Sequence, residues 1–154
     1  MFNKILIPLD GSELAEAALA PGFRIAEKFG SEVILLRVAV PEPMLVGLPA
    51  LAPGAYELYS GELRRDREEA EAHLYGIKMS WLGLGLPIRT QVLAGTPPEM
   101  IVEEAKVEGV DLIVMSTHGR SGLGRLIYGS VAEAVLRGAH MPVMLIPAKA
   151  PDPI

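Results

Sequence analysis

Five apolar runs of strand length constrain the fold of this chain more than any other feature. They lie at residues 4–9, 33–40, 88–93, 110–115 and 142–147, and each is bounded by glycine, proline or polar residues. Most of them are continuous instead of alternating with polar residues. A strand needs such a run when helices cover both faces of its sheet, because neither set of side chains then meets water. The pattern therefore predicts a parallel sheet.

The segments between these runs carry helical signals, so strands and helices alternate along the chain. Such alternation is typical of an α/β domain with right-handed crossovers. We expect a doubly wound five-stranded parallel sheet flanked by helices on both faces. The chain has 154 residues, half of them hydrophobic, which suits one compact domain. We assign residues 1–148 to this domain and residues 149–154 to a C-terminal tail.

Capping residues and glycines predict where the helices begin and end. The first helix should start after Ser12 and end near Gly30, with a kink or break at Pro21. The second should occupy roughly residues 56–82 and be terminated by Gly83 and Gly85. Its predicted core-facing residues recur at helical spacing: Leu63, Ala70, Leu74, Ile77 and Trp81.

Two further helices begin with capping-box spacing, in which a serine or threonine stands three residues before a glutamate. The third should start at Thr96, with Glu99 closing its box, and the fourth at Ser130, with Glu133 in the same role. The stretch 41–53, which holds four prolines, is the one long irregular segment. It would either cover a ligand or pack on the surface.

Composition excludes several classes of function. Fourteen Lys and Arg residues against nineteen Asp and Glu residues give a net charge of −5, so no positive field is available to hold a nucleic acid. The chain has no cysteine, which excludes disulfides, thiolate metal sites and a cysteine nucleophile. It contains neither a secretory signal nor the roughly 18 apolar residues of a membrane span. We therefore expect a cytoplasmic protein with no membrane or nucleic-acid partner.

Two predicted strand ends carry the candidate chemistry, since ligands of open parallel sheets bind beyond the carboxyl ends of the strands. At the first, Asp10 follows a buried strand and precedes Gly11 and the helix that Ser12 opens. This places a carboxylate and a helix N-terminus at the end of a buried strand, where ligands of such sheets bind. The alternative is structural, with Asp10 and Gly11 doing no more than forming the local turn.

The second is the stretch 115–130, which holds four glycines and two arginines and no acidic residue. Glycines allow the main chain to approach a ligand closely, and exposed amides followed by a helix N-terminus favour phosphate. The alternative is a surface loop in which Ser130 only caps its own helix.

Motifs of the common phosphate-binding enzymes do not occur. There is no Gly-Lys-Ser or Gly-Lys-Thr of a P-loop, no Gly-x-Gly-x-x-Gly after the first strand and no Gly-x-Ser-x-Gly of a hydrolase. The histidines at 73, 118 and 140 lack metal-ligand spacing. We therefore assign no catalytic residue and no metal ligand, and binding is favoured over turnover. A slow ATPase or phosphotransferase using Asp10 or His118 with magnesium is the enzymatic alternative.

The residues 5–12, 33–38 and 115–147 together resemble the universal stress protein family, in the right order over nearly the whole chain. The ATP-binding branch of that family carries Gly, two residues, Gly, nine residues, Gly and then Ser or Thr. In this chain Gly119, Gly129 and Ser130 fit that pattern, whereas Ser116 stands where the first glycine is expected. A serine there would lower affinity if its backbone needs positive φ or close contact, or would add a hydrogen bond to the ligand.

The resemblance implies an adenine nucleotide site and a homodimer. Adenosine would contact Pro8, Leu9 and Asp10, and the main chain of Val38 would meet the adenine edge. Ribose and phosphates would be lined by Met115, Ser116, Gly119 and Arg120, and the phosphate tail by Gly129, Ser130 and Val131. The implied ligand is ATP with Mg²⁺ or Mn²⁺ on its phosphates, and the implied role is regulation in the stress response.

The implied dimer would pair the last strand, from Met141 to Pro147, with its own copy. An uncovered edge this apolar would favour aggregation, and pairing buries its unpaired main-chain groups. A non-nucleotide interaction dimer of the same fold is the alternative that binding measurements would separate from the ATP-dependent one.

Overall fold

The computed structural model describes residues 1–40, 54–117 and 129–148. Its centre is a five-stranded sheet with the strand order β3-β2-β1-β4-β5, in which every neighbouring pair is parallel. The predicted doubly wound parallel sheet is therefore confirmed. The strands are β1 (Lys4–Leu9), β2 (Glu32–Ala39), β3 (Ile88–Ala94), β4 (Leu112–Thr117) and β5 (Val143–Pro147).

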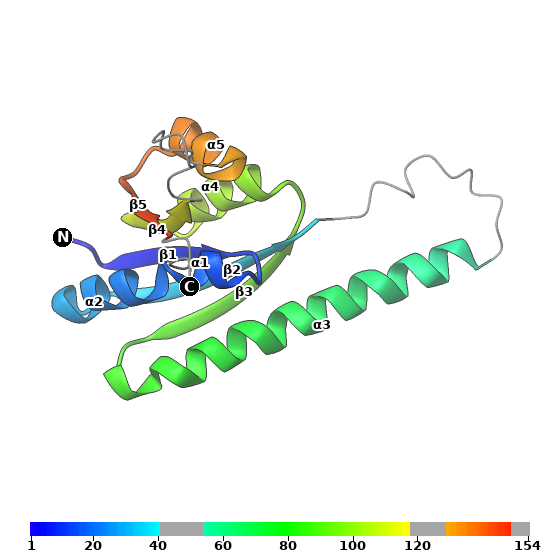
Figure 1. Ribbon diagram of the computed structural model, residues 1–154, viewed down its shortest axis with the longest axis horizontal. Coiled ribbons are helices and arrows are strands. Elements are labelled where there is room, and N and C mark those ends of the chain that lie inside the picture. The colour runs from blue at the N-terminus through cyan, green and yellow to red at the C-terminus, as the bar shows by residue number, and fades with distance from the viewer. Residues whose placement is uncertain (41–53, 118–128, 149–154) are drawn as a thin grey trace, which may run out of the picture.

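Helices cover both faces of the sheet (Figure 1). On one face lie α1 (Glu13–Glu16), α2 (Leu19–Phe29) and α3 (Ala55–Trp81), and on the other lie α4 (Pro97–Val107) and α5 (Ser130–Gly138). Successive side chains of β1 enter opposite cores, so Ile5 and Ile7 pack with the first group and Leu6 with the second. Both sets are fully buried, which explains why the apolar run is continuous.

The chain reverses its direction of winding between β1 and β4, and Pro8 keeps these two strands apart at their carboxyl ends. Glu32 N donates to Asn3 O, so the even-numbered residues of β1 direct their main-chain groups to β4. Pro8 has no N–H to donate there. Pairing of β1 with β4 stops at Leu6–Ile113, whereas β1 pairs with β2 as far as Leu9–Arg37. The sheet is thus open at its switch point.

Four of the five predicted strands have ends that are wrong by one or two residues: the third ends at Ala94 instead of 93, the fourth ends at Thr117 instead of 115, and the fifth begins at Val143 instead of 142. The second strand runs from Glu32 to Ala39 instead of 33–40, and the fourth begins at Leu112 instead of 110. Val110 is buried, but its N–H bonds to Ala105 O at the end of α4, so it belongs to the connection. The apolar residue at position 110 therefore reflects burial and not strand pairing.

The first predicted helix is broken in two, as the proline indicated, but the break precedes Pro21. Ser12 is the N-cap of α1, and its Oγ accepts from Ala15 N at 3.1 Å, as predicted. The helix stops at Glu16, because the ring of Pro21 would clash with the carbonyl four residues earlier, at Ala17. Gly30 ends α2 in the left-handed conformation, with φ of 67°.

The long helix α3 matches its prediction to within one residue at each end. Ala70, Leu74 and Ile77 are buried, and Trp81 packs against the same core with its ring stacked on Phe23. A 3₁₀ turn (Leu82–Leu84) follows the helix and ends at Gly85, which has φ of 67°. The N-terminal part of α3 extends beyond the sheet (Figure 1), and its residues 62 and 64–69 are exposed.

Neither predicted capping box forms. Thr96 is the N-cap of α4 but its side chain makes no capping bond, and the prolines at the next two positions have no N–H to offer it. Gly129, not Ser130, is the N-cap of α5, so Ser130 is the first residue of the helix. Glu133 pairs with Arg137 one turn later instead of closing back on Ser130.

Two predicted segments, 41–53 and the tail 149–154, lie outside the described residues. Within the described ranges, no helix has the length and apolar character that a membrane span requires.

Candidate functional site

A cavity of about 270 Å³ lies at the switch point, beyond the carboxyl ends of β1, β2 and β4. The residues that line it are Pro8, Leu9, Asp10, Leu14, Ala15, Leu36, Val38, Val40, Pro97, Ile101, Met115, Ser116, Gly129, Ser130, Val131 and Ala132. This is the position at which open parallel sheets bind their ligands. The gap left by Pro8 between β1 and β4 provides part of the space.

Asp10 forms the rim of the cavity and also organises the turn after β1. Its Oδ1 accepts from Ser12 N at 2.9 Å and from Ser12 Oγ at 2.5 Å. Gly11 has φ of 88°, which a residue with a side chain rarely adopts. Asp10 and Gly11 therefore do form the local turn, as the structural alternative predicted. A role of Asp10 in ligand binding is compatible with this turn, because its exposed carboxyl group also lines the cavity.

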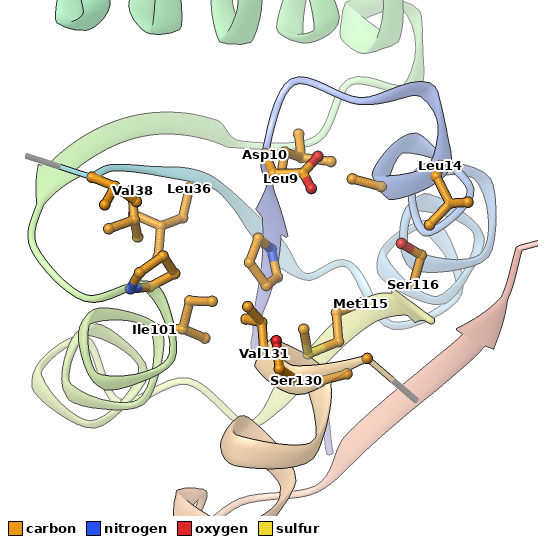
Figure 2. Close-up of a pocket in the computed structure, with 16 residues that line it drawn as sticks. Leu9, Asp10, Leu14, Leu36, Val38, Ile101, Met115, Ser116, Ser130 and Val131 are labelled. Atoms are coloured by element: carbon orange, nitrogen blue, oxygen red, sulfur yellow. The ribbon is translucent and has the colours of Figure 1, made fainter. Parts of the chain in front are cut away.

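Ser116 enters the cavity from the end of β4 beside the buried Met115 (Figure 2). The half-buried Ser116 directs its hydroxyl toward the space between Asp10 and Leu14. No non-glycine residue in the described ranges has positive φ. Serine therefore occupies the expected glycine position without backbone strain, so positive φ is not what the family glycine supplies here.

The start of α5 presents unpaired amides at the opposite wall. Gly129 has φ of 75° and ψ of 153°, a conformation that favours glycine. No side chain of the described residues caps this end, and within the helix the first bond is Glu133 N to Gly129 O. The N–H groups at positions 130–132 therefore have no partner within the helix. Together with the helix dipole they form a site suited to an anion.

The remaining wall is apolar. Leu36 and Val38 come from alternate positions of β2 and lie on the same side of the cavity as Ile101 of α4 (Figure 2). Leu36 and Ile101 are almost completely buried. Among the described lining residues Asp10 is the one ionisable side chain. The cavity thus joins a flat apolar side to a polar side made of a carboxylate, two hydroxyls and helix amides.

The structure brings together nine of the site residues that the sequence indicated: Pro8, Leu9, Asp10, Val38, Met115, Ser116, Gly129, Ser130 and Val131. Gly119 and Arg120 lie outside the described residues, as does His118. Seven lining residues were missed: Leu14, Ala15, Leu36, Val40, Pro97, Ile101 and Ala132. Strand alternation from Val38 would have found Leu36 and Val40, and the helix start after the third strand would have found Pro97.

No group of three or more His, Asp or Glu side chains suited to a metal ion occurs in the part of the chain that the structure describes.

Comparison with known proteins identifies the fold family. The model of the universal stress protein family matches residues 1–147. The chain belongs to the universal stress protein family. A relative, universal stress protein MJ0531 of Methanocaldococcus jannaschii, is 40% identical over 146 residues, which cover 95% of this chain and 82% of the relative.

Solved universal stress proteins share the architecture. The structure of MJ0577 from the same archaeon superposes with a TM-score of 0.78 at 32% identity, covering 98% of this chain and 99% of that one. A universal stress protein family member from Arabidopsis thaliana, solved with AMP bound, has a TM-score of 0.65 at 18% identity and covers 96% and 93% of the two chains. At that identity the likeness concerns the fold alone.

Proposed function

We propose that the cavity binds ATP or another adenine nucleotide, and that this universal stress protein acts as a nucleotide-dependent regulator in the cytoplasm during stress. One observation carries the proposal: an apolar wall and helix amides that have no capping partner among the described residues line one cavity at the switch point of the sheet. A nucleotide has the matching two ends, a flat apolar base and an anionic phosphate chain. The AMP-bound structure from Arabidopsis thaliana shows that this fold is able to hold an adenine nucleotide.

The geometry favours one orientation of the nucleotide. The base would lie between Val38 and Ile101, with main-chain groups at the end of β2 available to its edge. The ribose would lie beside Asp10, whose second carboxylate oxygen accepts no hydrogen bond from the described residues. The phosphates would extend toward Gly129, Ser130 and the amide of Val131. Mg²⁺ or Mn²⁺ would then bind the phosphate oxygens, as such ions commonly do.

Calorimetric titration with ATP tests this proposal on the wild type and on Gly129→Val. Valine at φ of 75° would force the first turn of α5 to shift, and its side chain would fill the approach to the amides. We expect affinity for ATP to fall at least tenfold, which corresponds to about 1.4 kcal/mol.

The matched control is Gly109→Val. Gly109 also has a positive φ, of 64°, so valine is strained there too, but it lies at the end of α4 remote from the cavity and has open space around it. This variant should lose stability and keep its affinity for ATP. Equal affinity of the wild type and a folded Gly129→Val would place the phosphates elsewhere.

We also infer that β5 joins two copies into a homodimer. It is an edge strand whose neighbour on one side is β4, and Met144 on it is 38% exposed. Leu136 of α5 is exposed as well. Sedimentation velocity should give a dimer for the wild type and a monomer for Met144→Lys. A wild-type monomer at micromolar concentration would contradict this inference.

A further inference from the structure

The opposite edge of the sheet, at β3, presents unpaired main-chain groups. Val33 N donates to Pro87 O at the start of β3, and Gly95 N donates to Ala39 O at its end. Main-chain groups of a parallel strand point alternately to its two sides. The odd-numbered residues of β3 therefore bond to β2, and Ile88, Thr90, Val92 and Ala94 direct their N–H and C=O groups outward. No other strand of the described residues pairs with this edge.

A groove of about 730 Å³ runs along the same edge, between β3 and α3. Its floor is formed by residues 90–93 of β3, and its wall by Arg67, Glu68, Glu71, Ala72 and Tyr75 of α3. Tyr75 is 60% exposed although its ring borders the groove. An extended segment placed here would find hydrogen-bond partners on one side and an aromatic side chain on the other.

We propose that this edge binds an extended peptide segment of a partner protein, which adds to the sheet as a sixth strand beside β3. Main-chain hydrogen bonds would supply the general affinity, as in other strand-addition complexes. Every second side chain of the peptide would enter the groove toward α3. Unlike the nucleotide proposal, this inference uses no residue of the cavity.

The groove also specifies the side chains of the partner. Ala72 and Tyr75 offer an apolar surface to one position of the peptide. Arg67 Nε lies 3.1 Å from Glu71 Oε1 and Arg64 Nε lies 3.9 Å from Glu68 Oε1, and all four side chains are well exposed, so solvent screens both ion pairs. With Glu68 in the wall and a net charge of −5, the surface favours a peptide that alternates apolar and basic residues.

A second copy of the chain fits this edge less well than a partner peptide. If β5 pairs with its own copy, self-pairing of β3 would continue the sheet from dimer to dimer without end. A peptide adds only one strand to the sheet and carries no second sheet edge of this chain, so the extension ends there. Two-fold pairing through β3 is thus an outcome that the test must separate from peptide binding.

Fluorescence anisotropy with a labelled seven-residue peptide of alternating valine and lysine tests the proposal. We expect saturable binding to the wild type and at least tenfold weaker binding to Thr90→Pro. The exposed Thr90 has its N–H on the outer side, so proline there removes a donor from the open edge without breaking the ladder to β2. Thr90→Ala removes the same side chain, keeps the amide and should bind as the wild type does.

A second measurement does not depend on the folding of the proline variant. The same peptide, N-methylated at alternate residues, should bind the wild type at least tenfold more weakly. Glu68→Gln should weaken binding severalfold, and Glu103→Gln, on the exposed surface of α4, should not. In hydrogen exchange, bound peptide should slow the amides of Thr90 and Val92, whereas those of Arg89 and Gln91 are already protected.

Three results would overturn the proposal. The first is peptide binding that survives both N-methylation and Thr90→Pro in a folded variant. The second is the absence of binding to the wild type at millimolar protein concentration. The third is a wild-type oligomer that Thr90→Pro dissociates, which would assign the edge to a second copy of the chain.

Discussion

Ser116 is the residue at which this chain departs from the glycine pattern of its family, and the structure excludes one cost of that change, a strained backbone. The backbone has no positive φ at this position, so the serine is not a source of strain. Its hydroxyl faces the cavity (Figure 2). The structure therefore favours the interpretation in which the hydroxyl contacts the ligand.

Removing the hydroxyl should consequently weaken nucleotide binding. We predict that Ser116→Gly and Ser116→Ala each lower ATP affinity by about 0.5–1.5 kcal/mol, the usual contribution of one hydrogen bond. Calorimetry on both variants separates loss of the hydroxyl from gain of backbone freedom, because only glycine adds the latter. Tighter binding by Ser116→Gly would show that the serine obstructs the ligand.

At the level of single residues, sequence rules succeeded where one local interaction decides the outcome. Ser12 caps α1 as expected, since its hydroxyl and the amide of Ala15 are neighbours in the chain. The rule failed at Ser130, where Gly129 takes the N-cap position with a φ that only glycine adopts easily. The carboxylate of Glu133 is held by Arg137, a competing partner that the capping-box pattern does not contain.

Among the elements, β1 and β4 determine the shape of the site. Their pairing stops at Leu6–Ile113 because Pro8 offers no donor to β4. The strands diverge from there, and Pro8, Met115 and Ser116 line the resulting space. An ordinary residue at position 8 would allow the ladder to continue.

We therefore predict that Pro8→Ala closes part of the cavity. The new amide of residue 8 should be protected from hydrogen exchange, and ATP affinity should fall severalfold. Unfolding free energy should change by no more than about 1 kcal/mol, because the added hydrogen bond is offset by the greater freedom of the unfolded chain. Urea denaturation and calorimetry on the same variant measure both quantities. Unchanged affinity with a protected amide would contradict this role of Pro8.

The number and parallel pairing of the strands followed from continuous apolar runs, but the order of the strands across the sheet and several strand ends did not. Hydropathy reports burial, and Val110 is buried without belonging to β4. Likewise, Ile101 lines the cavity only because β2 and α4 are brought together by the crossover. Residues next to a motif in the chain could be predicted, whereas those that reach the site through tertiary packing could not.

On the scale of the whole molecule, the two ends of the sheet differ in character. The carboxyl ends hold the cavity, and the amino ends hold a charged cluster of Lys4, Glu32, Arg89 and Glu108. Arg89 pairs with both Glu32 and Glu108, and Lys4 Nζ lies 3.4 Å from Glu108 Oε2. These contacts join β1, β2 and β3 to the end of α4.

This cluster predicts a specific loss of stability in acid. The hydrogen bond from Arg89 holds the pKa of Glu108 below its usual value. A carboxyl group whose pKa is lowered on folding stabilises the protein above its unfolded pKa, and that contribution is lost as the pH falls through the folded value. The wild type should therefore be more stable than Glu108→Gln at pH 7, and this difference in stability should disappear as the pH drops below about 4.3. Urea midpoints at pH 7 and pH 3 measure this, and an advantage unchanged at pH 3 would contradict it.

Thermal denaturation with and without ATP and Mg²⁺ tests the central claim most directly. A ligand at a hundredfold excess over its dissociation constant stabilises the fold by about 2.7 kcal/mol, so we predict a rise in Tm of roughly 5–10 °C. The rise should be lost in Gly129→Val and kept in Gly109→Val. An unchanged Tm with ATP, ADP and AMP alike would contradict nucleotide binding. It would favour the alternative, an interaction dimer of the same fold that binds no nucleotide.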